Sequence, residues 1–159
     1  YTDLGGAQQS MFPITTINTT SYDGTQIVNF LRGERVNESP AGMRNRSDEA
    51  NGTGGPTLGD IIHSRPYYVA DGTNPALFVG ANDGMLHAFN ATTGAERWAY
   101  VPSMLLDKMA KLAQPYGTIS NPHDYFVDGR INVGTVDIGG TASRILVSGL
   151  GAGGKGLFA

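Results

Sequence analysis

The residues with the most distinctive chemical spacing form a glycine-rich run, Gly149-Leu150-Gly151-Ala152-Gly153-Gly154-Lys155-Gly156. Three of its glycines match the G-x-G-x-x-G fingerprint of dinucleotide sites, and the run follows Ile145-Leu146-Val147, which predicts a strand. Such a site also needs a helix N-terminus for the pyrophosphate and a later acidic residue, whereas Leu157-Phe158-Ala159 predicts another strand. Gly156 stands where a phosphate loop needs Ser or Thr to bind Mg²⁺. We therefore predict that the run serves close strand packing, or a bulge in a hairpin, and does not bind nucleotides.

The other side chains that could do chemistry are scattered along the chain. The three histidines, His63, His87 and His123, lack metal-ligand spacing and are predicted to be structural or surface residues. Four aspartates stand beside glycines or at strand starts, which is typical of turn caps: Asp60, Asp83, Asp124 and Asp128. None of them belongs to a D-x-D-x-D-G calcium loop. Arg44 and Arg46 indicate a small basic spot or, more simply, a solvated loop. We predict no catalytic, cofactor-binding or metal-binding residue in this chain.

The composition narrows the class of protein. The chain has 159 residues, 23 of them glycine, with 40% hydrophobic and 16% charged residues, which favours a β-rich body with tight turns. A net charge of −3 does not suit a phosphate backbone, so we expect no nucleic-acid partner. No run of about 18 apolar residues is present, which predicts no membrane-spanning helix. The lack of cysteine excludes disulfides and thiolate sites. Because the chain starts at Tyr1, we expect a processed or excised piece of a longer protein.

Residues 82–100 carry the strongest structural pattern. Asp83-Gly84 lies between two apolar runs, which favours a tight hairpin because glycine accepts positive φ at little cost. Thr92-Thr93-Gly94 separates the next two runs, and Trp98 follows four residues after that glycine. Consecutive hairpins with a large aromatic side chain at a fixed offset are typical of one blade of a β-propeller.

The predicted fold class is all-β, a β-propeller fragment of about one and a half four-stranded antiparallel blades. Residues 58–102 form the first blade, with strands predicted near residues 67–70, 76–81, 85–91 and 96–101. Residues 123–159 form an incomplete second blade, with strands predicted near residues 131–138, 144–149 and 156–159. Open strand edges promote association, so we expect this fragment to aggregate or to fold only partly when it is made alone.

Two segments outside the blades are predicted to hold short helices. Residues 1–57 are an irregular lead-in with one helix near 26–32, for which Thr25 is a candidate N-cap and Gly33 a stop, followed by a long polar loop over residues 34–57. Residues 103–122 are a helical insertion and loop, with a helix near 103–114 and Ser103 as its candidate N-cap. Apolar residues form one stripe on this helix and are predicted to pack on the body: Leu105, Leu106, Met109, Leu112 and Ala113.

The segment Ala88-Phe89-Asn90-Ala91-Thr92-Thr93-Gly94-Ala95-Glu96-Arg97-Trp98 resembles the repeat of quinoprotein-like propellers. Those blades carry an A-x-D-x-x-T-G-x-x-x-W pattern, and the resemblance implies that Trp98 docks adjacent blades together. Asn90 replaces the usual Asp and keeps a side chain that can cap the turn. The pattern is shared by quinone dehydrogenases, outer-membrane assembly lipoproteins and adhesins, so it specifies fold more than activity.

The order of several separated motifs narrows the resemblance to one family. The motifs are Leu58–Pro66, Val79–Phe89, Trp98–Pro102, His123–Gly129 and Gly149–Gly156. Over about residues 26–159, this order is similar to the C-terminal propeller of the PilC/PilY family, the type IV pilus tip-associated adhesins and assembly factors. The resemblance implies an exported bacterial protein at the pilus tip, cell surface or outer membrane.

The same resemblance implies a non-enzymatic interaction module in pilus assembly, twitching motility and attachment. The implied partners are minor pilins and the pilus tip, host or abiotic surfaces, and further propeller blades or another chain at the open strand edge. Some family members bind calcium through an acidic propeller loop, which is expected C-terminal to Ala159, so no metal ligand is assigned here. Two alternatives stay open: the propeller of a quinone (PQQ)-dependent dehydrogenase, and a propeller scaffold lipoprotein of the outer-membrane assembly type.

Overall fold

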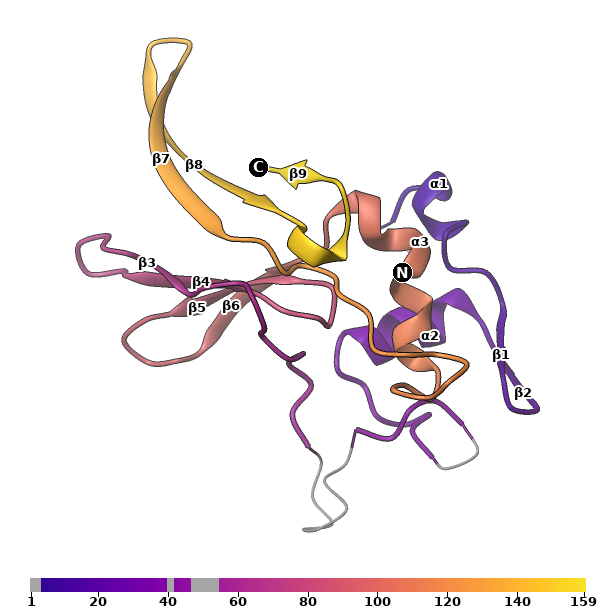
Figure 1. Ribbon diagram of the computed structural model, residues 1–159. Coiled ribbons are helices and arrows are strands. Elements are labelled where there is room, and N and C mark those ends of the chain that lie inside the picture. Colours follow the sequence, from indigo (N-terminus) through magenta and orange to yellow (C-terminus); the bar gives the residue numbers. More distant parts are fainter. Residues whose placement is uncertain (1–3, 40–41, 47–54) are drawn as a thin grey trace. The chain divides into compact units, whose positions relative to one another are not determined.

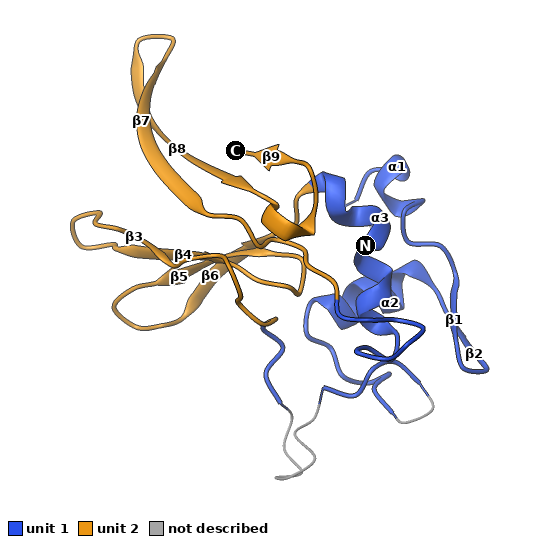
Figure 2. Cartoon of the chain, in the orientation of Figure 1, with its two compact units in different colours: residues 1–58, 103–123 blue, residues 59–102, 124–159 orange. Residues whose placement is uncertain are grey.

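The computed structural model describes residues 4–39, 42–46 and 55–159. The chain forms two compact units, each built from two separate stretches (Figure 2). The first unit contains Tyr1–Leu58 and Ser103–His123, and the second contains Gly59–Pro102 and Asp124–Ala159. The lead-in and the helical insertion, which the sequence analysis treats as separate segments, therefore fold into the same unit. Part of the predicted polar loop, residues 40–41 and 47–54, lies outside the described residues.

The second unit consists of two antiparallel sheets (Figure 1). The first sheet has the order β3-β4-β5-β6, with strands Tyr67–Val69, Ala76–Gly80, Leu86–Asn90 and Glu96–Tyr100. The second has the order β7-β8-β9, with strands Ile131–Ile138, Thr141–Gly149 and Leu157–Phe158. The short 3₁₀ segment η3, Gly151–Gly153, joins β8 to β9. The predicted fold class, mostly antiparallel β with a few short helices, is confirmed.

The turns of the first sheet form for the reasons that the sequence indicates. Gly84 adopts φ 93° between β4 and β5, and Gly94 adopts φ 74° between β5 and β6. The Asn90 side chain accepts hydrogen bonds from the backbone N–H groups of Thr92 at 2.9 Å and Thr93 at 3.1 Å. The prediction that Asn90 keeps the capping role of an aspartate is therefore confirmed.

The first unit is mainly helical, with one small hairpin. Its elements are α1 Gly6–Gln9, β1 Thr15–Ile17, β2 Thr20–Tyr22, α2 Gly24–Leu31, η1 Ser103–Leu105, α3 Leu106–Met109 and η2 Ala110–Ala113. Segment η2 packs against α2, and all five residues of the predicted apolar stripe are buried. Burying a leucine side chain of this kind contributes about 1.5–3 kcal/mol, which explains why the stripe faces inward.

Three details of the first unit differ from the predictions. Helix α2 is capped by Asp23 and not by Thr25, because Asp23 and Gln26 exchange side-chain hydrogen bonds with each other's backbone N–H at 2.9 Å. Ser103 is the first residue of η1 and does not cap a helix, since the insertion winds as 3₁₀, α and 3₁₀ in succession. The lead-in is not wholly irregular, because Asn18 accepts φ 54° and turns the chain into the β1–β2 hairpin.

Candidate functional site

The turn between β4 and β5 is the polar centre of the second unit. Asn82 accepts a hydrogen bond at its side-chain oxygen from the backbone N–H of Phe126 at 3.0 Å, and its amide donates to Asp60 at 3.1 Å. Asp83 accepts hydrogen bonds from the backbone N–H groups of Gly59 at 2.8 Å and Met85 at 3.1 Å. Two buried or partly buried side chains thus fix segments that lie more than 20 residues before and 40 residues after them.

His87 lies on β5 between two carboxylates. Its Nδ1 is 2.6 Å from Glu96 Oε1, and its Nε2 is 3.0 Å from Asp83 Oδ2. Ionised carboxylates only accept hydrogen bonds and a neutral imidazole has one N–H, so both contacts are hydrogen bonds only when the ring is protonated. Burial lowers the pKa of His87, but the hydrogen bonds and charges of Asp83 and Glu96 outweigh burial and raise it above the ordinary 6.5. The prediction of a structural histidine is confirmed for His87.

A bulge in β6 brings Glu96 to this histidine. Ala88 pairs with Trp98, whereas Phe89 pairs with Glu96, so Arg97 is an extra residue in the ladder. Regular alternation would put Glu96 on the same face as Trp98. The bulge instead places Glu96 on the face of His87, and Trp98 and Tyr100 on the opposite face.

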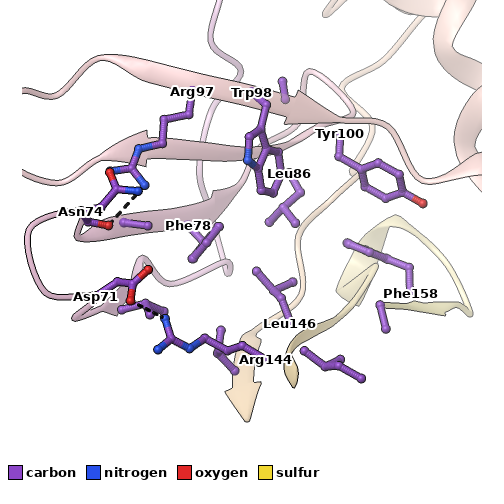
Figure 3. Close-up of a pocket in the computed structure, with 16 residues that line it drawn as sticks. Asp71, Asn74, Phe78, Leu86, Arg97, Trp98, Tyr100, Arg144, Leu146 and Phe158 are labelled. Carbon is purple, nitrogen blue, oxygen red and sulfur yellow. Dashed lines mark hydrogen bonds and ion pairs between the residues drawn. The ribbon is translucent and has the colours of Figure 1, made fainter. Parts of the chain in front are cut away.

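The face that carries Trp98 borders an open groove of about 850 Å³ between the two sheets of the second unit. Phe78, Leu86, Trp98 and Tyr100 of the first sheet line it from one side (Figure 3). Val133, Ile145, Leu146 and Phe158 line it from the second sheet. The Trp98 indole lies 5.8 Å from the Phe78 ring, and Tyr100 lies 5.8 Å from Phe158, measured between ring centroids.

Trp98 is 46% exposed in this groove. The expected orientation is correct, because the indole faces the neighbouring sheet. The implied docking of the two blades through Trp98 is incomplete in this structure, because the second sheet does not close over the indole and the groove remains open beside it.

One end of the groove is polar. Arg97 donates to the side chain of Asn74 at 2.6 Å and to the backbone oxygen of Pro75 at 2.7 Å (Figure 3). Arg144 forms an ion pair with Asp71 at 3.5 Å, in which both side chains are about half exposed. The groove therefore combines an apolar floor with two guanidinium groups that already have partners.

The glycine-rich run packs closely against the segment that precedes β7. A Cβ atom added at Gly153 would lie 1.9 Å from the backbone oxygen of Phe126, and one added at Gly129 would lie 2.0 Å from that of Gly149. Gly151 adopts φ +60°, and its Cβ would approach Asp128 to 2.8 Å. The prediction of close strand packing is confirmed, and a 3₁₀ turn, not a hairpin bulge, occupies residues 151–153.

The remaining predicted polar residues have different roles. Asp128, with 1% of its side chain exposed, accepts hydrogen bonds from the backbone N–H of His63 at 2.9 Å and from its Nδ1 at 2.6 Å. It therefore anchors a distant segment and is not a simple turn cap. Asp124 accepts a hydrogen bond from the N–H of Tyr125, the next residue. In the first unit, the exposed ring of His123 lies 5.7 Å from that of Tyr116.

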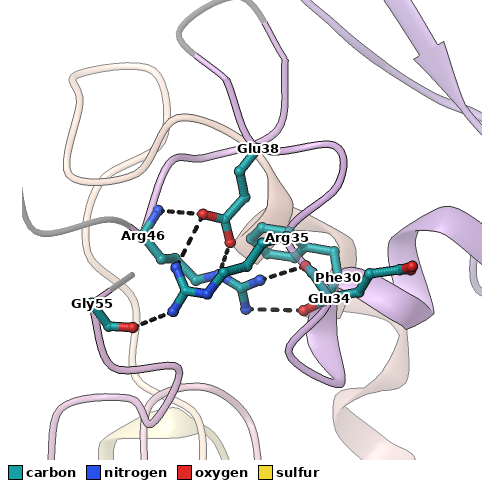
Figure 4. Close-up of polar contacts among 6 residues, drawn as sticks. All are labelled: Phe30, Glu34, Arg35, Glu38, Arg46 and Gly55. Atoms are coloured by element: carbon teal, nitrogen blue, oxygen red, sulfur yellow. Dashed lines mark hydrogen bonds and ion pairs between the residues drawn. The ribbon is translucent and has the colours of Figure 1, made fainter. Parts of the chain in front are cut away.

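Arg46 does not lie in a solvated loop. Only 7% of its side chain is exposed, and its guanidinium contacts Glu38 at 2.6 Å and donates to the backbone oxygens of Phe30 and Glu34 (Figure 4). Its charge also lies 3.7 Å from the centre of the Phe30 ring. Arg35 reaches the same Glu38 carboxylate at 3.3 Å and donates to the backbone of Gly55. No sequence signal marks this burial, because the residues are far apart in polar segments.

The described residues hold neither a metal-binding cluster nor a membrane-spanning helix. There, no group of three or more His, Cys, Asp or Glu side chains could hold a metal ion. None of the helices that these residues form has the length and hydropathy to span a bilayer.

Comparison with known proteins assigns the two-sheet unit to a family. Residues 59–159 match the family described as the PilY1 beta-propeller domain. The chain belongs to this family. The resemblance that the ordered motifs indicated is thereby confirmed, and the matched residues include the whole unit that holds both sheets together with residues 103–123 of the first unit.

The chain is also similar to curated proteins along most of its length. It is 34% identical over 167 residues to the type IV pilus biogenesis factor PilY1 of Pseudomonas aeruginosa strain UCBPP-PA14, an alignment covering 89% of this chain and 13% of that protein. It is 38% identical over 165 residues to a PilY1 homolog of Xylella fastidiosa strain Temecula1, covering 84% of this chain and 12% of that protein. The chain thus spans only a small part of the relatives that it matches. No solved structure gives a significant match.

Proposed function

We propose that this chain is part of the propeller of a type IV pilus biogenesis protein and works there as a non-enzymatic interaction module. The observation that carries the proposal is the family match over residues 59–159, together with relatives that are named as type IV pilus biogenesis factors. The antiparallel sheets supply a rigid body, and rigid bodies commonly present binding surfaces on their loops and faces.

The second sheet supports an interaction role because its outer face is apolar and exposed. The strand register places four apolar side chains on the face opposite the groove: Val136, Ile138, Val147 and Leu157. Their exposed fractions are 40%, 56%, 40% and 75%. Within the described residues, β9 pairs only with β8. An apolar face beside an open strand edge favours association, so we expect further propeller blades or another chain to cover this surface.

The partners and location follow from the family and are part of the proposal. We expect the protein to act at the pilus tip, cell surface or outer membrane of a bacterium, with minor pilins and host or abiotic surfaces as its contacts. The expected phenotypes are pilus assembly, twitching motility and attachment. Calcium binding is expected in an acidic loop C-terminal to Ala159 and not on the residues of this chain.

Complementation in a piliated bacterium that carries this protein tests the proposal. A deletion strain would receive the wild-type gene, a Gly153→Val variant that disrupts the second unit, or Gly134→Ala, whose Cβ meets no atom within 4 Å. We expect the wild type and Gly134→Ala to restore surface pili, twitching and attachment, and Gly153→Val to restore none of them. If the deletion itself leaves all three properties unchanged, the proposed function is wrong.

A separate assay tests the expectation that the protein is not an enzyme. The intact protein would be incubated with pyrroloquinoline quinone, calcium and a panel of alcohols and sugars, with reduction of an artificial electron acceptor as the readout. We expect no quinone-stimulated turnover above that of the heat-denatured protein. Turnover that requires both quinone and folded protein would favour the dehydrogenase alternative.

A further inference from the structure

The second unit holds another open pocket, of about 520 Å³, which differs in chemistry from the groove. It lies where the chain enters the first strand of each sheet, and β3 and β7 pack against each other there. Its lining includes His63, Arg65, Arg130 and the buried Asp128. Four of the eight residues that line this pocket carry charged or titratable side chains, whereas the groove has four aromatic side chains among its lining residues.

The two arginines of the pocket have no partner of their own. Arg65 and Arg130 are both exposed, and neither forms a hydrogen bond or an ion pair with any residue that the structure describes. Other arginines behave differently: Arg46 contacts Glu38 at 2.6 Å, Arg97 contacts Asn74 at 2.6 Å, and Arg144 contacts Asp71 at 3.5 Å. The pocket thus gathers unneutralised positive charge in a chain whose net charge is −3.

Asp128 brings a negative charge to the pocket, but its buried carboxylate is engaged by His63 and forms no ion pair with either arginine among the described residues. Its two carboxylate oxygens accept hydrogen bonds from the backbone N–H and the Nδ1 of His63, at 2.9 Å and 2.6 Å. Only 1% of the Asp128 side chain is exposed, whereas 63% of that of His63 is. The contact fixes the proton on Nδ1 and leaves Nε2 on the exposed side of a ring that is held in place. With a proton on Nδ1, Nε2 is an acceptor in the neutral ring and a donor in the protonated ring, so His63 adds a donor to the pocket only in its protonated form.

The sequence places the two arginines at corresponding points of the two sheets. Arg65 stands two residues before β3, and Arg130 stands directly before β7, the first strands of their sheets. Backbone at Gly129 and Gly151 lines the pocket between them, without a side chain to fill it. Guanidinium groups are planar forks that bind carboxylate, phosphate and sulfate oxygens through paired hydrogen bonds. Two such forks line one open pocket together with glycine backbone and the apolar side chains of Ile62 and Ala152, and their chemistry suits an oxyanion.

We propose that His63, Arg65 and Arg130 form a binding site for an oxyanion, a ligand group that carries phosphate, sulfate or carboxylate oxygens. The arginines supply charge and paired N–H donors, and His63, positioned by Asp128, donates from Nε2 when its ring is protonated. The site is independent of the proposed function in pilus biogenesis, because it rests on the pocket geometry alone.

Titration of the intact protein with inorganic phosphate, sulfate and citrate, each at low ionic strength, tests the site. The readouts are calorimetry and the NMR shifts of the arginine Nε–H groups. We expect all three anions to bind and to shift Arg65 and Arg130, and chloride at equal ionic strength to have little effect. The order of the three binding affinities distinguishes a site that prefers phosphate or sulfate from a site that prefers carboxylates.

Charge-removing variants locate the site. We expect Arg65→Gln and Arg130→Gln each to weaken binding about tenfold, since a hydrogen bond to a charged group contributes roughly that factor, and the double variant to weaken it further. Arg144→Gln removes the same charge outside the pocket and is expected to bind like the wild type. Arg65→Lys tests the fork geometry with the charge retained, and we expect intermediate binding.

Three results would overturn the site: no binding of any oxyanion to the wild type, equal weakening by Arg144→Gln, or chemical shifts confined to other arginines. Both pocket arginines are exposed, so their substitution is expected to leave the fold intact. A far-ultraviolet circular dichroism spectrum of each variant checks this. The outcome here is distinguishable from a failure of the proposed function, which is tested by pili, motility and attachment in cells.

Discussion

The two units of this chain differ in the groups that hold their irregular backbone in place. In the first unit, the charged side chain of Arg46 reaches out to the backbone oxygens of Phe30 and Glu34. In the second unit, side chains such as Asp83 and Asp128 accept hydrogen bonds from distant backbone N–H groups, and glycines at positions 129, 151 and 153 also let backbone segments approach too closely for any Cβ. Both solutions leave few polar groups without partners, as buried backbone requires.

This difference indicates which kind of substitution destabilises each unit. A unit that is held through a buried guanidinium depends on the carboxylate that compensates its charge. Neutralising that carboxylate by one substitution therefore leaves a buried positive charge without compensation. A unit held by close backbone contact depends on the lack of a side chain, so one added carbon removes the contact. Substitutions of these two kinds should therefore unfold different parts of the same chain, and hydrogen exchange measured peptide by peptide can tell them apart.

The largest effect is expected from Gly153→Val. The Cβ would lie 1.9 Å from the Phe126 oxygen, and neither backbone segment can retreat without breaking its own hydrogen bonds. We expect a destabilisation of more than about 4 kcal/mol, enough to prevent the second unit from folding. Hydrogen exchange of the intact protein should show loss of protection over β3–β9 while α2 stays protected. Gly134→Ala, with no atom within 4 Å of its Cβ, is the control and should keep wild-type protection.

The next effect is expected from Glu38→Gln in the first unit. The substitution removes the charge that balances Arg46, whose side chain is 7% exposed. Removing one partner of a buried ion pair costs about 3–5 kcal/mol. Protection of backbone amides from hydrogen exchange should therefore fall in α2 and in η1–α3–η2, whereas protection in β4 and β5 should stay unchanged. The matched control is Glu34→Gln, because the exposed Glu34 contacts Arg46 through its backbone only. Equal losses in both variants would contradict this account.

A smaller and pH-dependent effect is expected at His87 in the second unit. Its folded-state pKa is raised, so the stability that its protonation supplies is present in full below pH 6.5 and is lost as pH rises through the raised pKa. His87→Gln should destabilise the unit by about 2 kcal/mol under acidic conditions, through loss of charged hydrogen bonds. Urea unfolding across this pH range should show the wild type and the variant converging at high pH. A difference in the free energy of unfolding between wild type and variant that grows with pH would mean that the pKa of His87 is lowered and not raised by folding.

The smallest effect is expected at the β5–β6 turn. Asn90→Ala removes two hydrogen bonds to the backbone N–H groups of Thr92 and Thr93, and should cost about 1 kcal/mol. Asn90→Asp restores the residue type of the quinoprotein-like repeat and keeps an acceptor, so it should be close to neutral. Urea midpoints of the three proteins give the comparison. A large loss in the Asp variant would show that the amide nitrogen, and not the oxygen, supports the turn.

Local rules in the sequence predicted much of the second unit. Strand β7 matches the predicted residues 131–138, because β-branched residues and the Gly139-Gly140 turn mark its course. The hairpins at Gly84 and Gly94 follow from the need for positive φ. The close approach at Gly153 was recognisable as a packing role, since no helix follows the glycine-rich run.

The missed features depend on contacts between distant residues or on departures from a period. The bulge at Arg97 moved Glu96 to His87, and no local pattern distinguishes a bulge from regular alternation. The burial of Arg46 depends on Glu38 and on a turn of α2. The true cap of α2 did carry a signal, because Asp23 and Gln26 stand at the spacing of a capping box. The open groove beside Trp98 reflects how far apart two sheets stand, which single-strand patterns do not encode.

The extra residue in β6 places Glu96 and Trp98 of the same strand on opposite faces of the sheet. Glu96, before the bulge, contacts His87 on one face of its own sheet, and Trp98, after the bulge, faces the neighbouring sheet. Deleting Arg97 would turn the bulge into a regular ladder that still pairs Ala88 with Trp98 and Phe89 with Glu96, so both side chains would keep their faces and the contacts of Arg97 with Asn74 and Pro75 would be lost. The face of Glu96 therefore depends on where the bulge sits: a ladder that paired Arg97 regularly with Phe89 would carry Glu96 to the face of Trp98 and away from His87.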